Sequence, residues 1–98
     1  MIGPSPAIHP GEILREEFLA PLGLTPYGVA KAVGVPRTRI ERLAREEAPV
    51  TADTALRLGR YLGTGPEFWM NLQAAYDLVT TAPNIPSLAT IKPHQAAA

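Results

Sequence analysis

Proline and glycine divide this chain into short segments, and this division constrains the possible folds more than any other feature of the sequence. Apolar residues recur at helical spacing between them, as Leu14 and Phe18 do in the first segment and Leu58 and Leu62 in the fourth. We find no alternation typical of strands and no internal repeat. The sequence therefore predicts an all-α fold of five short helices.

The ends of the expected helices can be located from capping residues. Thr25 and Thr51 are suited to cap the second and fourth helices, and Gly34 and Gly63 are suited to end them. His9 directly precedes the first helix, where capping is its simplest role. We expect helices over about residues 10–20, 26–33, 36–47, 52–62 and 66–80.

The chain is expected to hold one domain with two flexible ends. Its 98 residues suffice for one modest core but not for two. Residues 1–9 and 81–98 are rich in proline and small residues and show no period that would bury a face. We therefore expect a single domain over residues 10–80, flanked by flexible termini.

The composition argues against several classes of function. Cysteine is absent, which excludes disulfides and thiolate zinc sites, and the two histidines, His9 and His94, lie at opposite ends of the chain. We find no nucleophile paired with a base, no carboxylate pair suited to acid and base roles, and no phosphate-binding glycine loop. We expect no metal, no cofactor, no small-molecule substrate and no enzymatic activity.

The sequence also gives no sign of a membrane protein. Its apolar runs are far shorter than the roughly 20 residues that span a bilayer, and its first residues lack the pattern of a signal peptide. We expect a cytoplasmic protein.

Charge is unevenly distributed along the chain. The net charge of zero argues against a nucleic-acid partner, because such proteins usually carry a basic excess. Residues 25–50, however, hold five basic side chains against three acidic ones. The positive excess is therefore local, and it lies on the segment that also carries the strongest motif.

That motif is a pair of short helices joined by a glycine turn, which is typical of the helix-turn-helix unit. The second helix of such a unit enters the major groove, so we expect Arg37, Thr38 and Arg42 to face base edges. The residues suited to phosphate contacts are Thr25, Tyr27 through its amide, Arg39 and Arg45. The alternative is an amphipathic helix whose arginines face only water, and spacing alone leaves both interpretations open.

The last expected helix carries more apolar surface than one small bundle can cover. Its two neighbouring stripes comprise Phe68, Leu72, Ala75 and Val79 on one side and Trp69 and Tyr76 on the other. We expect a homodimer whose contacts include Phe68, Trp69, Leu72, Tyr76 and Val79, and a dimer of this kind would bind an inverted repeat. The alternative is that Trp69 completes the core of the single chain.

Residues 9–78 resemble the HigA-type antitoxins, which are grouped with the VapI proteins in the XRE-type helix-turn-helix family. The resemblance lies in the runs HPGEIL, TADTALRL and FWMNLQ and in the turn and helix GVPRTRI. It implies a five-helix fold of the lambda-repressor type and a dimer that binds operator DNA and represses its own operon. It further implies that the protein neutralises a RelE/HigB-like toxin that cleaves mRNA, and that it acts in the bacterial cytoplasm at the nucleoid.

Two departures from the family pattern concern DNA binding. Pro36 stands where many relatives have a serine or threonine that caps the third helix, so a cap must come from elsewhere. Glu46 and Glu47 follow that helix where relatives carry glycine and basic residues, and they should weaken binding if they face DNA. A neutralising antitoxin without DNA binding and a stand-alone repressor therefore remain alternatives.

The distribution of charged residues is the feature of the sequence from which a toxin-binding surface can be located. A toxin that acts on RNA should present a basic surface, and the first helix offers the acidic residues Glu12, Glu16 and Glu17. We expect the toxin to dock against the N-terminal segment and this helix and to leave the third helix free. The competing expectation places the contact on residues 81–98.

Overall fold

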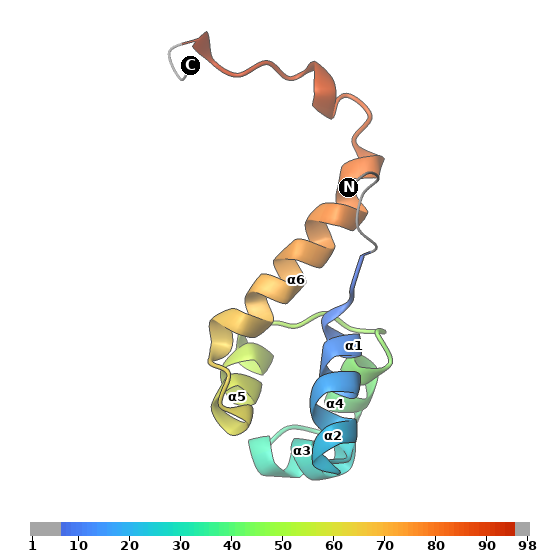
Figure 1. Ribbon diagram of the computed structural model, residues 1–98, viewed down its shortest axis with the longest axis vertical. Helices are drawn as coiled ribbons and strands as arrows, with labels where there is room; N and C mark the ends of the chain where they lie inside the picture. The colour runs from blue at the N-terminus through green and yellow to red at the C-terminus, as the bar shows by residue number, and fades with distance from the viewer. Residues whose placement is uncertain (1–6, 96–98) are drawn as a thin grey trace.

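The computed structural model describes residues 7–95 and is all-helical over that range (Figure 1). The five expected helices are all present in this part of the chain, so the predicted fold class is confirmed. No helix among the described residues is both long and apolar enough to cross a bilayer.

The first helical segment is continuous from Pro10 to Leu22 but changes its winding. It consists of α1 (Pro10–Ile13), a π-helical stretch η1 (Leu14–Leu19) and α2 (Ala20–Leu22). His9 caps it as expected, because its Nδ1 accepts a hydrogen bond from the amide of Gly11 at 2.9 Å. The His9 side chain is buried, so the folded part of the chain begins before the expected boundary at residue 10.

The helix-turn-helix unit comprises α3 (Pro26–Val33) and α4 (Arg37–Ala44). Thr25 caps α3 by accepting a hydrogen bond from the amide of Gly28 at 3.0 Å. Gly34 ends α3 with a φ of 78°, a left-handed conformation that glycine adopts without strain. The turn between the two helices is therefore set by residues that the sequence identified.

The end of α4 differs from the expectation that this helix continues to about Glu47. Glu46 takes a left-handed conformation with a φ of 65°, and its amide donates to the carbonyl of Leu43 at 2.9 Å. The amide of Glu47 donates to the carbonyl of Arg42 at 2.8 Å. These two bonds form a Schellman motif, which ends the helix at Ala44.

The remaining helices, α5 (Ala52–Leu62) and α6 (Pro66–Thr81), pack against each other and complete the bundle. Thr51 caps α5 through the amide of Thr54, as expected. Gln73 of α6 is buried and accepts a hydrogen bond from the amide of Val50 at 2.7 Å. This bond fixes the loop between α4 and α5 to α6.

Trp69 lies at the centre of the packing. Its side chain is 0% exposed within the single chain, and its ring lies 5.4 Å from that of Phe18 and 5.0 Å from that of Phe68 between centroids. The expectation that Trp69 contacts a second copy is therefore wrong, and the alternative of a core residue is correct. The helix bundle closes over the ring and leaves no surface for a partner.

The two expected flexible ends are described only in part. Residues 1–6 and 96–98 lie outside the described range. Beyond α6, the chain forms two single 3₁₀ turns, η2 (Ala82–Asn84) and η3 (Leu88–Thr90), and leads away from the bundle (Figure 1). All residues from 82 to 95 are exposed.

Candidate nucleic-acid interface

The side chains expected to read bases lie together on the exposed side of α4. Arg37 and Thr38 stand in its first turn and Arg42 in its last, and all three are exposed. The opposite side buries Ile40, Leu43 and Ala44 in the core. The amphipathic pattern thus fixes which side of α4 faces outward.

No side chain within residues 7–95 caps the start of α4. Pro36 occupies the cap position without a side-chain bond, and its carbonyl accepts the amide of Arg39 at 3.0 Å. The expectation that a cap comes from elsewhere in the chain is therefore wrong. Proline presets the backbone before the first turn and leaves the amides of Arg37 and Thr38 at an exposed helix start.

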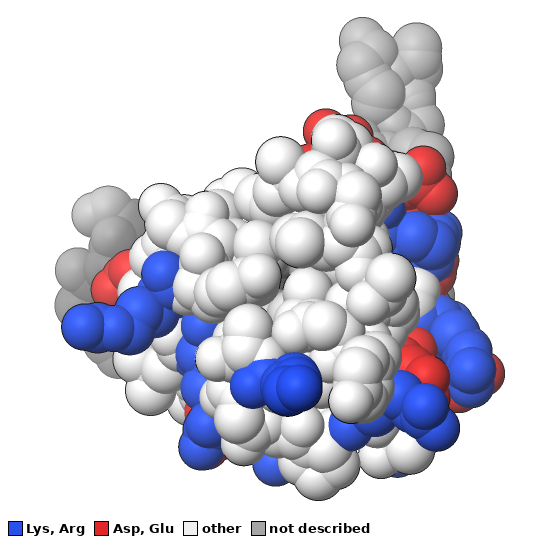
Figure 2. Space-filling view, turned by 90° about the horizontal axis from the view of Figure 1, so that it is seen from below, with Lys and Arg blue, Asp and Glu red and all other residues white. Residues whose placement is uncertain are grey.

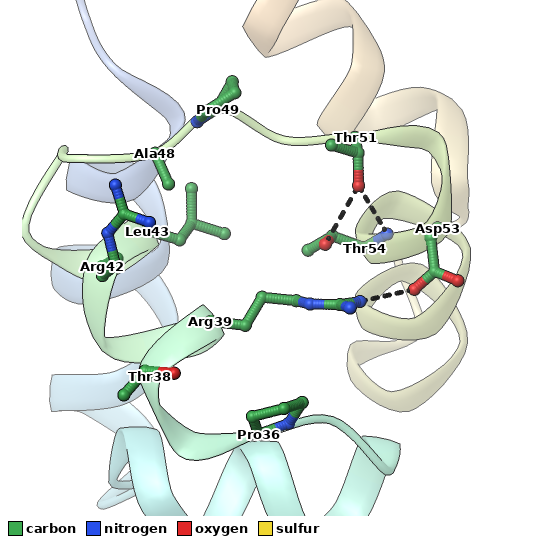
Figure 3. A pocket seen from close by; sticks show the side chains of 10 residues that line it. All are labelled: Pro36, Thr38, Arg39, Arg42, Leu43, Ala48, Pro49, Thr51, Asp53 and Thr54. Atoms are coloured by element: carbon green, nitrogen blue, oxygen red, sulfur yellow. Dashed lines mark hydrogen bonds and ion pairs between the residues drawn. The ribbon is translucent and has the colours of Figure 1, made fainter.

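A hollow of about 510 Å³ adjoins this side of α4 (Figure 3). Thr38, Arg39 and Arg42 line it from α4, and Thr51, Asp53 and Thr54 line it from the start of α5. Arg39 extends across the hollow toward α5 (Figure 3). Such a concave surface, with basic side chains on its α4 wall, is suited to a backbone or groove of nucleic acid.

The arginines within α4, and Arg45 directly after it, already pair with carboxylates or with a backbone carbonyl. Arg37 Nε lies 3.2 Å from Glu41 Oε2, and Arg42 donates to the carbonyl of Glu47 at 3.2 Å. Arg45 lies 4.0 Å from the Glu47 carboxylate. These contacts are at the surface and therefore weak, so the side chains can exchange them for a ligand at small cost.

Thr25 and Tyr27, the residues expected to contact phosphate from α3, are both exposed. The end of the molecule at which α3 lies has basic side chains around a largely uncharged centre, with acidic side chains toward the rim (Figure 2). This end of the fold therefore carries basic side chains on several sides.

The two glutamates after α4 have different surroundings. Glu46 lies 3.2 Å from Arg15 Nη2, and the same guanidinium donates through Nη1 to the carbonyl of Ala44 at 2.6 Å. Arg15 therefore joins the first helical segment to the end of α4 and balances the charge of Glu46. Glu47 is exposed beside Arg45 and remains the acidic side chain that could oppose DNA at this end of α4.

Asp53 and Arg57, which the sequence did not single out, extend the site onto α5. Asp53 Oδ1 accepts hydrogen bonds from Arg39 Nη1 and from Arg57 Nε, each at 2.7 Å. The bond from Arg57, supported by Arg39, holds the pKa of the Asp53 carboxyl below its ordinary value. The spacing of Asp53 and Arg57 is that of a helical ion pair and was visible in the sequence, but the link to Arg39 was not.

The acidic residues expected to bind a toxin lie on the first helical segment, and Glu12, Glu16 and Glu17 are all exposed. Glu16 pairs with Arg15 at 3.1 Å. Within the described part of the chain, no three His, Asp or Glu side chains come together as a metal site would require.

Comparison with known proteins identifies relatives over most of the chain. Residues 14–69 match the helix-turn-helix family HTH_3. The chain is 58% identical over 73 residues to virulence-associated protein I of Dichelobacter nodosus, covering 74% of this chain and 68% of that protein. It is 44% identical over 71 residues to antitoxin HigA-1 of Vibrio cholerae, covering 72% of this chain and 67% of that protein.

A solved structure supports the same grouping. The structure of Pseudomonas aeruginosa antitoxin HigA with the higBA promoter superposes with a TM-score of 0.83 at 41% identity, covering 90% of this chain and 98% of that one. The chain therefore belongs to the helix-turn-helix family of HigA-type, VapI-like antitoxins, which are DNA-binding proteins and not enzymes.

Proposed function

We propose that this protein is the antitoxin of a toxin–antitoxin module and binds operator DNA as a dimer to repress its own operon. The observation that carries the proposal is the exposed set of Arg37, Thr38 and Arg42 on α4, beside a hollow whose α4 wall is basic. The related Pseudomonas aeruginosa HigA, whose structure includes the higBA promoter, supports it. The protein would act in the bacterial cytoplasm, at the nucleoid.

The assignment of roles on α4 is tested with a duplex from the region upstream of the protein's own gene. Arg37→Ala or Arg42→Ala should each cost about 1 to 3 kcal/mol and relax base preference at particular positions. Arg39→Ala should weaken binding to all sequences alike, because phosphate contacts carry no sequence information. Unchanged affinity of the Arg37→Ala, Arg42→Ala double variant in a gel shift would refute the assignment.

The dimer would form through α6 without Trp69. Phe68 is 37% exposed and Val79 is 42% exposed, whereas Leu72 and Tyr76 are partly buried. All four residues belong to α6, whose C-terminal part leads away from the bundle (Figure 1). Light scattering on the full chain tests the dimer, and a strict monomer at tens of micromolar would contradict it.

The toxin partner would be a RelE/HigB-like mRNA-cleaving protein that docks on the N-terminal segment and first helix. The exposed carboxylates of Glu12, Glu16 and Glu17 support this placement, since they complement a basic RNA-facing surface. The exposed apolar side chains of Ile85, Leu88 and Ile91 favour the competing placement on residues 81–98.

Growth rescue on co-expression with the toxin of the neighbouring gene separates the two placements. Replacing Glu12, Glu16 and Glu17 by lysine should abolish rescue if the first helix is the contact. Loss of rescue on deleting residues 81–98, with the charge-reversed variant still active, would establish the other placement. If the protein neutralises a toxin without binding DNA, it should rescue growth but should not shift the DNA duplex in the gel.

A further inference from the structure

The carboxylate of Asp53 lies at the edge of the hollow that α4 presents to DNA. We propose that Asp53 is a positioning residue for DNA binding, which holds the Arg39 guanidinium in place across the hollow before DNA arrives. The inference rests on the proposed DNA-binding function and adds a residue outside the helix-turn-helix unit. It also explains why an acidic side chain stands on a surface that meets phosphate.

Asp53 and Arg57 of α5 together link α4 and α3. Asp53 Oδ1 accepts from Arg39 of α4 at 2.7 Å (Figure 3). The same oxygen accepts from Arg57 of α5, also at 2.7 Å. Arg57 in turn donates through Nη1 to the carbonyl of Val33, the last residue of α3, at 2.7 Å. Asp53 thus binds Arg39 while it is itself bound by Arg57, which is fixed to the end of α3.

Stability does not account for this cluster. The side chains of Arg39, Asp53 and Arg57 are 43%, 55% and 41% exposed, and ion pairs exposed to this degree add little to the free energy of folding. A carboxylate at this place also repels the phosphates of a duplex. Asp53 also stands in the first turn of α5, where a carboxylate suits the helix dipole, and its contact with Arg39 is the part of its surroundings that bears on DNA.

Arginine has many rotamers, and a binding partner must order them at a cost in entropy. The guanidinium is a rigid fork of five N–H donors, so one fixed hydrogen bond orients the rest of the group. Asp53 takes one donor of Arg39 and leaves others for a phosphate. Two arginines and one carboxylate leave this cluster with a net charge of +1, so it still attracts DNA.

The opposite interpretation makes Asp53 a competitor that withholds Arg39 from DNA. The two interpretations predict opposite changes in DNA affinity when the charge of Asp53 is removed. Asp53→Asn keeps the shape of the side chain but replaces the charge-assisted bond to Arg39 by a weaker neutral one, so it should weaken binding if Asp53 positions Arg39. It should strengthen binding if Asp53 competes with phosphate or merely repels it.

The experiment measures the affinity of the full chain for a labelled duplex from upstream of its own gene, by fluorescence anisotropy at low salt. We expect Asp53→Asn to raise Kd about 3- to 10-fold, which is the cost of ordering one free arginine side chain. Glu47→Gln is the matched control, because it removes one exposed negative charge near the end of α4 without contacting Arg39. This control should leave Kd equal or lower.

A second pair of variants separates positioning from a structural role. In the Arg39→Ala background, Asp53→Asn should cause no further loss of affinity, because its effect passes through Arg39. An equal loss in both backgrounds would mean that Asp53 supports the fold alone, and this would overturn the proposal. Tighter binding of Asp53→Asn than of the parent would also overturn it. A parent chain that binds no duplex would refute the proposed DNA-binding function itself.

Discussion

Gly11 in α1 packs directly against the backbone carbonyl group of Leu43 in α4. A Cβ atom added at Gly11 would overlap this carbonyl oxygen and also approach His9 Nδ1 to 3.1 Å. The first helical segment therefore lies against the reading helix at a distance that only glycine allows. The HPG run thus fixes how α4 is presented, in addition to starting the first helix.

Gly11→Ala should destabilise the fold by about 1 to 3 kcal/mol, because the new methyl group forces the backbones of α1 and α4 apart. Helix propensity alone predicts the opposite sign, since alanine is favoured over glycine within a helix. Urea unfolding followed by circular dichroism distinguishes the two. Glu12→Ala at the neighbouring exposed position serves as the control and should change stability by less than about 0.5 kcal/mol.

Trp69→Ala should cost roughly 3 to 5 kcal/mol of unfolding free energy, because it removes a fully buried ring that contacts Phe18 and Phe68. Circular dichroism is the suitable measurement, since the variant lacks the tryptophan signal. Met70→Ala at the next position, which is 39% exposed, should cost far less. Equal losses in the two variants would show that Trp69 is not the centre of the core.

Glu41→Gln should tighten binding to the upstream duplex about twofold. The Arg37–Glu41 pair runs along α4 itself, whereas the Asp53 contact extends Arg39 across the hollow, so Glu41 competes for Arg37 with a pair worth about 0.3 to 0.5 kcal/mol. The variant also removes a negative charge next to the reading side chains. Anisotropy titration gives the change in Kd. In an Arg37→Ala background there is no arginine to release, so Glu41→Gln should increase the affinity for DNA by a smaller factor. Weaker DNA binding by Glu41→Gln than by the parent chain would contradict the prediction.

Stability should fall as the pH is lowered below about 6.5, the ordinary pKa of histidine. Burial lowers the pKa of His9 in the folded chain, although the charges of Glu46 and Asp77 act in the opposite direction. Between the lowered folded pKa and 6.5 the unfolded chain binds more protons, so acid favours unfolding. Protonation would also remove the acceptor that binds the amide of Gly11.

The comparison for this prediction is His9→Asn, since asparagine caps helices without titrating in this range. Unfolding midpoints at pH 7.5 and 5.5 should differ more in the parent than in the variant. The same difference in both proteins would assign the effect to other groups. Tyr76, whose ring meets that of His9 edge-on at 4.8 Å between centroids, offers a spectroscopic signal for the protonation step.

The sequence by itself determined the number of helices and most of their ends. Thr25, Thr51 and His9 cap helices as expected because a cap bonds to an amide two or three residues away in the chain. The apolar period likewise fixed which side of α4 is buried, and therefore which arginines are exposed. These features depend on neighbours in sequence, so the sequence shows them directly.

Only the tertiary structure decided how these helices meet. The end of α4 depends on Glu46 taking a left-handed conformation that glycine or asparagine adopts more readily, beside Arg15 from the first helical segment. Trp69 was assigned to the wrong surface because periodicity gives the side of a helix but not the number of helices that close over it. Arg39 and Asp53 are 14 residues apart, and their contact exists because the packing of α5 beside α4 brings two exposed side chains within 2.7 Å. No local pattern encodes that distance.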